Sequence, residues 1–246
     1  MPPLSIMIKP ASSLCNMRCE YCFYHNVTEL REVSSFGIMT NETADNLIEK
    51  ALAFVNGESV AFAFQGGEPL MAGLPYFEHF VEKVKSANHL HSQIYFSTQT
   101  NGTLVTDEWC EFFHKNNFLV GLSLDGNFEH NKFRVDANRE NTFYKILNAA
   151  EKFKKHKVEF NILTVLTGYC ADNIDDIYKF FRNKGFRYLQ FIPCLRPFND
   201  NTESELHMTP EQYGDFLVKC FNYYVKDYVS GQYTSVRWFD NIVHQF

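Results

Sequence analysis

The sequence lacks the long apolar run that a membrane-spanning helix requires. None of its hydrophobic stretches approaches about 18 residues, the length that crosses the hydrocarbon core of a bilayer. The first residues also lack the basic segment and the extended apolar segment of a secretory signal peptide. We therefore expect a cytoplasmic protein without a membrane partner.

A surplus of positive charge is missing as well. The 246 residues include 23 Lys and Arg against 29 Asp and Glu, which gives a formal net charge of −6. A chain with this balance has no general attraction for nucleic-acid phosphates, so we expect no nucleic-acid partner. The hydrophobic share of 45% and the charged share of 21% are typical of a globular protein with a sizeable core.

The third absence is a disulfide framework. The seven cysteines are an odd number and three of them are bunched, which does not fit the paired, spaced cysteines of a small secreted protein. This cysteine usage indicates a reducing and anaerobic compartment.

The bunched cysteines, Cys15, Cys19 and Cys22, form a C-x3-C-x2-C run within eight residues. Three thiolates this close can bind one metal centre from a single loop. A closed zinc site and an ordinary iron–sulfur cluster each need four ligands. Three thiolates therefore favour a four-iron cluster with one iron left open for another ligand. His25 leaves an alternative open, because it could complete a Cys3His zinc site in a zinc-stabilised binding module.

The rest of the chain alternates strands with helices. Apolar runs followed by turn residues predict six strands, over residues 5–9, 60–65, 93–98, 118–124, 158–166 and 188–192. Amphipathic spacing and capping residues predict helices over residues 40–57, 76–85, 107–115, 142–155 and 174–183. Thr40 would be the N-cap of the first of these helices, and Gly57 would end it. This order implies parallel strands joined by right-handed crossovers. We expect an α/β fold, an open three-quarter (β/α)6 TIM-like barrel with its site at the C-terminal ends of the strands.

The C-terminal part departs from this alternation. Residues 199–205 are polar and predict a loop. Thr209 as N-cap and Pro210 at the first helical position predict a helix that runs to about residue 229.

The sequence predicts two parts. We expect a partial barrel over residues 1–200 and a helical extension over residues 201–246. Residues 239–246 have a helical pattern without a stop signal, so we expect a truncated chain.

Several runs resemble a known family. The C-x3-C-x2-C run followed by Phe23 resembles the cluster loop of the radical S-adenosylmethionine (SAM) enzymes. The longer runs over residues 9–25, 62–69 and 99–103 resemble the anaerobic sulfatase-maturating enzymes of the SPASM subgroup. The resemblance extends over essentially the whole chain and implies the radical SAM barrel.

The resemblance implies two cofactors and the residues that bind them. Cys15, Cys19 and Cys22 would bind a [4Fe-4S] cluster whose open iron chelates SAM. Seven residues would contact SAM, namely Tyr21, Gly66, Gly67, Glu68, Ser123, Arg134 and Leu195. Weaker candidates for substrate contact are Gln65, Gln99 and Asn101. Without the resemblance, the turn after the second strand would be an ordinary β-turn and the arginine a solvated surface charge.

The resemblance also implies an activity. Such enzymes cleave SAM reductively and use the resulting radical to oxidise a Ser or Cys of a sulfatase to Cα-formylglycine. The catalytic base is expected beyond residue 246, in a SPASM domain that would also hold two auxiliary [4Fe-4S] clusters in a full-length form. The partners would be a sulfatase peptide or protein and a low-potential electron donor of the flavodoxin or ferredoxin type. Another peptide-modifying SPASM enzyme, such as a thioether-forming maturase, is the alternative.

Overall fold

The computed structural model describes residues 3–196, 202 and 204–245. The loop predicted over residues 199–205 lies largely outside these residues. The chain divides into two compact units, which are described one at a time. Unit 1 comprises Met1–Arg18, Cys22–Gly121 and Leu147–Phe160, and unit 2 comprises Cys19–Tyr21, Leu122–Ile146 and Asn161–Phe246.

Within the described residues, seven strands form one sheet, in which neighbouring strands follow the order of the chain. The strands are β1 (Leu4–Ile8), β2 (Val60–Phe64), β3 (Ile94–Thr100), β4 (Phe118–Ser123), β5 (Phe160–Leu166), β6 (Tyr188–Pro193) and β7 (Ser235–Val236). The pairs β1–β2, β2–β3, β5–β6 and β6–β7 are parallel. β1 and β7 are the two ends of the strand order, so the sheet is open. The predicted open α/β fold is confirmed, with one short strand more than expected.

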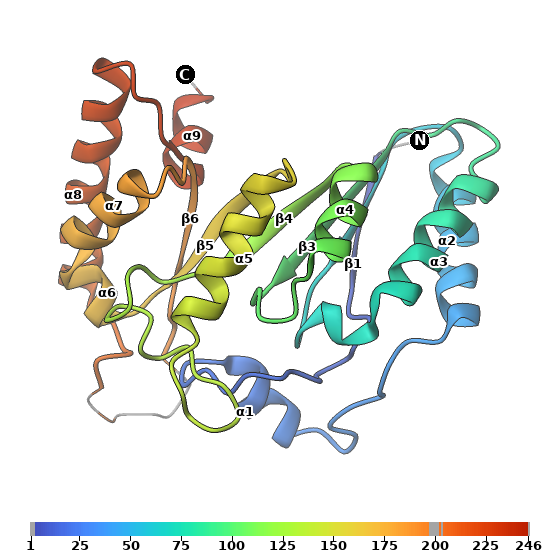
Figure 1. Ribbon diagram of the computed structural model, residues 1–246, viewed down its shortest axis with the longest axis horizontal. Helices are drawn as coiled ribbons and strands as arrows, with labels where there is room; N and C mark the ends of the chain where they lie inside the picture. Colours follow the sequence, from blue (N-terminus) through green and yellow to red (C-terminus); the bar gives the residue numbers. More distant parts are fainter. Residues whose placement is uncertain (1–2, 197–201, 203, 246) are drawn as a thin grey trace. The chain divides into compact units, whose positions relative to one another are not determined.

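In unit 1, three helices accompany the first strands (Figure 1). They are α2 (Asn41–Val55), α3 (Leu74–Ala87) and α4 (Asp107–Lys115). The predicted N-cap of α2 is confirmed, because the Thr43 backbone N–H donates to Thr40 Oγ1 at 3.2 Å. The helix ends at Asn56, whose left-handed backbone precedes the predicted stop at Gly57 by one residue.

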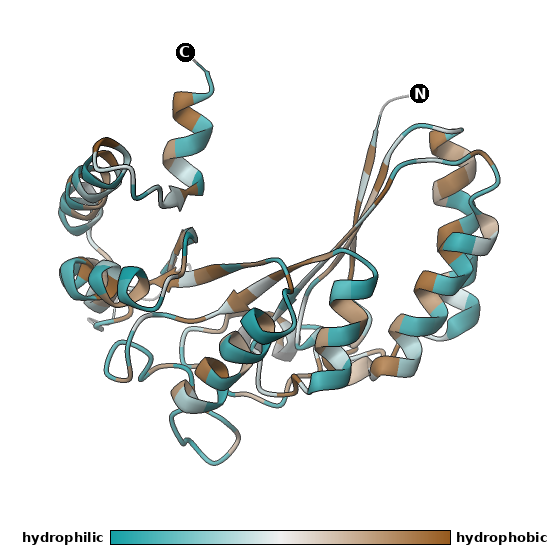
Figure 2. Ribbon diagram, turned by 45° about the horizontal axis from the view of Figure 1, so that its top comes forward, coloured by the Kyte–Doolittle hydropathy of each residue, from teal (hydrophilic) through white to brown (hydrophobic). Residues whose placement is uncertain are grey.

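The core of unit 1 is aromatic. Phe62 and Phe64 on β2 meet Phe80 of α3 edge to face, with ring centroids 5.2 and 5.0 Å apart. Phe96 of β3 stacks on Phe118 of β4 at 5.1 Å. Figure 2 shows helices that carry both apolar and polar segments, as amphipathic helices packed on one side do. Rings of this size bury a large apolar area and fix the strands whose ends carry the candidate site.

The described residues of unit 2 contain the end of β4, nearly all of β5, the strands β6 and β7, and four complete helices. The helices α6 (Gly168–Asp172), α7 (Ile174–Asn183) and α8 (Pro210–Val229) pack together, and α9 (Arg237–Val243) packs on β6 and β7. The predicted cap at Thr209 is confirmed as a full capping box. Thr209 Oγ1 accepts from the Gln212 N–H, and the Gln212 side chain accepts from the Thr209 N–H.

The elements without a predicted counterpart are short. They are α1 (Phe23–Glu29), the 3₁₀ turn η1 (Pro69–Ala72), α6 and β7. α1 has no side-chain N-cap and β7 spans two residues, so neither gives a periodic or capping signal. The helix α5 (Phe143–Lys155) matches its prediction closely. Within the described part of the chain, no helix has the length and apolar character needed to cross a membrane.

A buried carboxylate joins three elements of unit 2. Asp227 on α8 is completely buried, and its Oδ2 accepts hydrogen bonds from Tyr178 Oη at 3.0 Å and Thr234 Oγ1 at 2.8 Å. Arg182 Nη1 lies 3.1 Å from Oδ1 as an ion pair without hydrogen-bond geometry. Tyr178 and Arg182 belong to α7, and Thr234 directly precedes β7. Asp227 therefore connects α8 with α7 and with the start of β7.

We predict that Asp227→Ala lowers the free energy of unfolding by about 3 kcal/mol, because two buried hydroxyls and a half-buried guanidinium lose their acceptor. Urea denaturation at neutral pH measures the change. Asp215→Ala, which removes an exposed carboxylate from the same helix, serves as the control and should change stability by less than about 0.5 kcal/mol. Equal effects of the two substitutions would contradict this role of Asp227.

Candidate functional site

The predicted site residues follow the C-terminal ends of strands in both units. In unit 1, residues 65–68 follow β2. Gln99 is the last residue but one of β3, and Asn101 directly follows that strand. In unit 2, Ser123 ends β4 and Leu195 follows β6. The C-terminal edge of parallel strands is where α/β barrels place their chemistry.

The cysteine loop, residues 15–22, leads into α1, for which Cys22 is the N-cap. None of its three cysteines forms a disulfide, and all three are partly exposed. Cys15 Sγ accepts hydrogen bonds from the Met17 backbone N–H at 3.4 Å and from Asn101 Nδ2 at 3.9 Å. Burial raises the pKa of the Cys15 thiol to about 11. N–H donors directed at a sulfur are typical of the surroundings of iron–sulfur ligands.

Among the described residues, no three His, Cys, Asp or Glu side chains are placed to hold one metal ion. His25, the fourth ligand of the zinc alternative, lies within α1.

The glycine turn after β2 packs directly on the segment before the cysteine loop. Gly66 and Gly67 have φ values of +84° and +56°, which L side chains rarely adopt. A Cβ at Gly67 would lie 2.3 Å from the Leu14 carbonyl oxygen, so only glycine fits there. The Glu68 N–H donates to the same carbonyl oxygen at 2.8 Å. The turn and the start of the cysteine loop are therefore held together by their backbones.

The Glu68 carboxylate is buried among hydrogen-bond donors of unit 1. It is 1% exposed and accepts from the Leu70 N–H at 3.1 Å, Thr100 Oγ1 at 2.8 Å and the Asn101 N–H at 2.7 Å. In the structure this carboxylate joins the glycine turn to the end of β3, and the SAM contact that the resemblance implies for Glu68 stays a prediction. Burial raises the pKa of Glu68 to about 7, against the hydrogen bonds that lower it.

The two candidates at the C-terminal end of β3, Gln99 and Asn101, differ in their surroundings. Gln99 extends over Gly121 of β4, where a Cβ would lie 2.0 Å from Gln99 Oε1. Gly121 therefore provides the space that the Gln99 side chain occupies. Asn101 is buried and points instead to the cysteine loop, where its Nδ2 donates to Asn16 Oδ1 at 2.9 Å.

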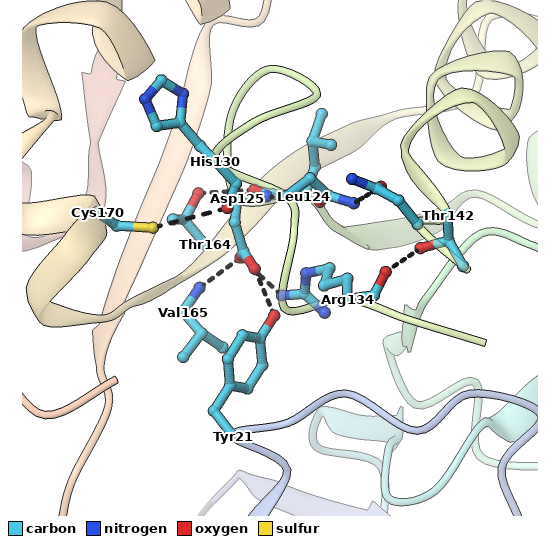
Figure 3. Close-up of polar contacts among 11 residues, drawn as sticks. Tyr21, Leu124, Asp125, His130, Arg134, Thr142, Thr164, Val165 and Cys170 are labelled. Carbon is cyan, nitrogen blue, oxygen red and sulfur yellow. Dashed lines mark hydrogen bonds and ion pairs between the residues drawn. The ribbon is translucent and has the colours of Figure 1, made fainter. Parts of the chain in front are cut away.

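In unit 2 the site is organised by Asp125, which the sequence did not single out as a site residue. Figure 3 shows Tyr21 and Arg134 pointing to its carboxylate. Tyr21 Oη donates to Oδ2, while Arg134 Nη2 and the Val165 N–H donate to Oδ1 at 3.0 and 2.9 Å. The strand end at Ser123 followed by Asp125 and a glycine was the available signal, but the sequence assigns this aspartate equally well to a turn.

Arg134 keeps one donor for a further partner. Its guanidinium is buried, pairs with Asp125 and lies 5.4 Å from the centre of the Tyr21 ring. Its Nε is buried and has no hydrogen-bond partner among the described residues. Burial raises the pKa of Tyr21 well above its usual range, so its phenol stays a proton donor to Asp125. A buried unpaired Nε–H is a suitable donor for an anionic ligand group.

The remaining two candidates differ in exposure. Ser123 is buried at the end of β4, whereas Leu195 is 84% exposed. An exposed leucine next to a strand end is compatible with a contact to a flat apolar ligand. Their roles remain predictions.

We predict that Glu68 makes the chain less stable as the pH rises. The folded chain holds the Glu68 proton with a pKa of about 7 against an ordinary value of 4.5, so the folded state binds more protons between these values. Stability is then greatest below the ordinary value and falls as the pH passes 7, by about 2 kcal/mol between pH 5 and pH 8.

Urea denaturation of the unchanged chain and of Glu68→Gln at the two pH values measures this loss. The difference in stability between the two proteins should change with pH in favour of the variant at pH 8. A difference that is the same at both pH values would show that Glu68 does not titrate in this range.

Known proteins resemble this chain over most of its length. The Radical SAM superfamily profile matches residues 10–181. A cysteine-type anaerobic sulfatase-maturating enzyme of Clostridium novyi is 44% identical over 245 residues, which are 99% of this chain and 65% of that protein. A serine-type anaerobic sulfatase-maturating enzyme of Bacteroides thetaiotaomicron is 33% identical over 241 residues, covering 92% of this chain and 58% of that protein.

The fold is similar to that of a solved structure as well. Native anSMEcpe with bound AdoMet and the Cp18Cys peptide matches with a TM-score of 0.91 and 45% identity, over 97% of this chain and 64% of that chain. This chain therefore spans between 58% and 65% of the length of these three relatives. Since the superfamily profile matches from the segment before the cysteine loop into α7, this chain belongs to the radical SAM superfamily.

Proposed function

We propose that this chain is the radical SAM part of a cysteine-type anaerobic sulfatase-maturating enzyme, which oxidises a cysteine of a sulfatase to Cα-formylglycine. The observation that carries the proposal is the cysteine loop, in which the first of three clustered thiols receives two N–H donors. The relatives named cysteine-type are 44–45% identical to this chain, whereas those named serine-type are 31–33% identical. This difference favours cysteine as the target residue.

The cysteine loop fits a [4Fe-4S] cluster. Cys15, Cys19 and Cys22 are its only expected protein ligands, which leaves one iron for SAM. The donors at Cys15 Sγ suit a thiolate, since N–H groups stabilise the negative charge on a ligating sulfur.

The residues around the strand ends fit SAM. In unit 1 the candidates for contact with the SAM amino group are the backbone carbonyls of Gly66 and Gly67, which have no side chains of their own to cover them. In unit 2 the unpaired Nε of Arg134 and the hydroxyl of Ser123 suit the carboxylate and the ribose. Tyr21 and Leu195 would lie against the adenine, and Asp125 would orient both Tyr21 and Arg134.

Held by Cys15, Cys19 and Cys22, the cluster would supply, together with SAM, the radical chemistry for removal of a hydrogen atom from Cβ of the target cysteine. The protein residues supply binding, orientation and exclusion of water. Arg134 holds its guanidinium in one orientation through the ion pair with Asp125. Gln65 and Gln99 are candidates to contact the peptide from unit 1.

Other parts of the proposal concern the longer protein. We place the catalytic base and two auxiliary [4Fe-4S] clusters in a C-terminal SPASM part, which follows a partial barrel over residues 1–200 and an extension over residues 201–246. The electron would come from a flavodoxin or ferredoxin type of donor, in the cytoplasm of an anaerobic cell.

We predict that this chain transfers deuterium from the target cysteine to SAM-derived 5′-deoxyadenosine. The chain is reconstituted with iron and sulfide and incubated without oxygen with SAM, dithionite and a sulfatase peptide deuterated at Cβ of its cysteine. Mass spectrometry should find deuterium in the 5′-deoxyadenosine. This readout follows hydrogen abstraction alone, so it does not need the base or the auxiliary clusters.

Three controls define the outcome. A peptide deuterated at Cα should give unlabelled 5′-deoxyadenosine, a peptide with Cβ-deuterated serine should transfer less label, and Cys19→Ala should form no 5′-deoxyadenosine. Abundant 5′-deoxyadenosine without label from Cβ would contradict the proposed reaction and leave the superfamily assignment in place.

A further inference from the structure

Asn101 makes its side-chain contacts with the cysteine loop and its own turn. Its Nδ2 lies 3.9 Å from Cys15 Sγ and 2.9 Å from Asn16 Oδ1. Its Oδ1 accepts from the Thr103 N–H at 2.9 Å and from Thr103 Oγ1 at 2.7 Å. Asn16 Nδ2 in turn donates to Thr103 Oγ1 at 2.8 Å. These bonds close a ring that fixes which atom of the Asn101 amide is the donor facing the sulfur.

The backbone of Asn101 is fixed as firmly as its side chain. Its N–H donates to Glu68 Oε2 at 2.7 Å, and the preceding Thr100 Oγ1 donates to Glu68 Oε1 at 2.8 Å. Glu68 and Thr100 are both 1% exposed, and Asn101 is 8% exposed. Because the carboxylate is anchored in the glycine turn, the position of Asn101 is set by two strand ends rather than by a flexible loop.

Cys15 Sγ therefore has donors of two origins. The Met17 N–H, at 3.4 Å, comes from the cysteine loop itself. The Asn101 Nδ2–H comes from the end of β3, 86 residues along the chain. The fold, and not the local sequence of the loop, supplies this second donor.

We infer that Asn101 is a positioning residue for the iron–sulfur cluster, whose side-chain amide donates to Cys15 Sγ and raises the reduction potential of the cluster. The inference rests on the proposed function, because it requires the cluster. Reduction adds an electron whose charge is shared by the ligating sulfurs, so an N–H directed at a sulfur stabilises the reduced cluster more than the oxidised one. The role differs from the substrate contact that the sequence resemblance implies for Asn101.

The sharpest test is Asn101→Asp. Aspartate keeps the oxygen that accepts from Thr103, so the turn is retained, but it replaces the donor at Cys15 Sγ with a carboxylate oxygen. The potential is measured on the reconstituted 246-residue chain by a dithionite titration followed by electron paramagnetic resonance, without SAM or peptide. We expect the equilibrium constant for one-electron reduction to fall about tenfold, which is a shift of about 59 mV to more negative potential.

Two further variants complete the test. Asn101→Ala removes the donor without adding charge and should shift the potential in the same direction by a smaller amount. Asn88→Asp is the matched control, because Asn88 also lies in unit 1 and bonds through its side chain, to Ser92, but precedes β3 instead of following it. The reduction potential of the cluster in Asn88→Asp should equal that in the unchanged chain.

The outcomes separate this inference from the proposed function. An unchanged potential in Asn101→Asp, with four irons bound, would overturn the inference while leaving the radical SAM assignment intact. A second outcome is that both Asn101 variants lose iron while they keep the circular dichroism spectrum of the unchanged chain and Asn88→Asp keeps its full iron content. This result would support positioning of Cys15 by Asn101. A variant that differs from the unchanged chain only in its apparent affinity for peptide would assign Asn101 to the substrate instead.

Discussion

The buried carboxylate of Glu68 is the interaction on which the unit 1 part of the site depends. A carboxylate that is almost completely buried is stable only if its oxygens are satisfied, and here three donors satisfy them. One donor belongs to the turn after β2 and two belong to the end of β3. The glycine turn, the segment before the cysteine loop and Asn101 are therefore fixed relative to one another before any cofactor binds.

Unit 2 contains a second buried carboxylate whose oxygens also accept three hydrogen bonds. Asp125, directly after β4, accepts from a tyrosine of the cysteine loop, an arginine and a backbone N–H of β5. A buried ion pair is weak evidence for stability, because removal of both charges from water costs about as much as their attraction returns. The pair of Asp125 and Arg134 holds a guanidinium in one orientation and leaves its Nε without a partner among the described residues, which suits the proposed contact with a ligand.

The sequence predicts those features that depend on local chemistry. The threonine caps at Thr40 and Thr209, the strand ends and the parallel order follow from patterns within a few residues, and the structure confirms them. The inward orientation of Glu68 and the central place of Asp125 depend on partners 33 and 104 residues away along the chain. No local pattern encodes such contacts, so the sequence alone does not predict them. The division at residue 200 is likewise not encoded locally and stays a prediction.

The most direct test of the account is the metal content of the chain, because every proposed role presupposes the cluster. Iron, acid-labile sulfide and zinc are measured, with a visible spectrum, on protein purified and reconstituted without oxygen. The account predicts about four irons per chain with the broad absorption of an iron–sulfur cluster, and their loss when Cys15, Cys19 and Cys22 are replaced by alanine. One tightly bound zinc ion and no iron would contradict it and indicate a metal-stabilised binding domain.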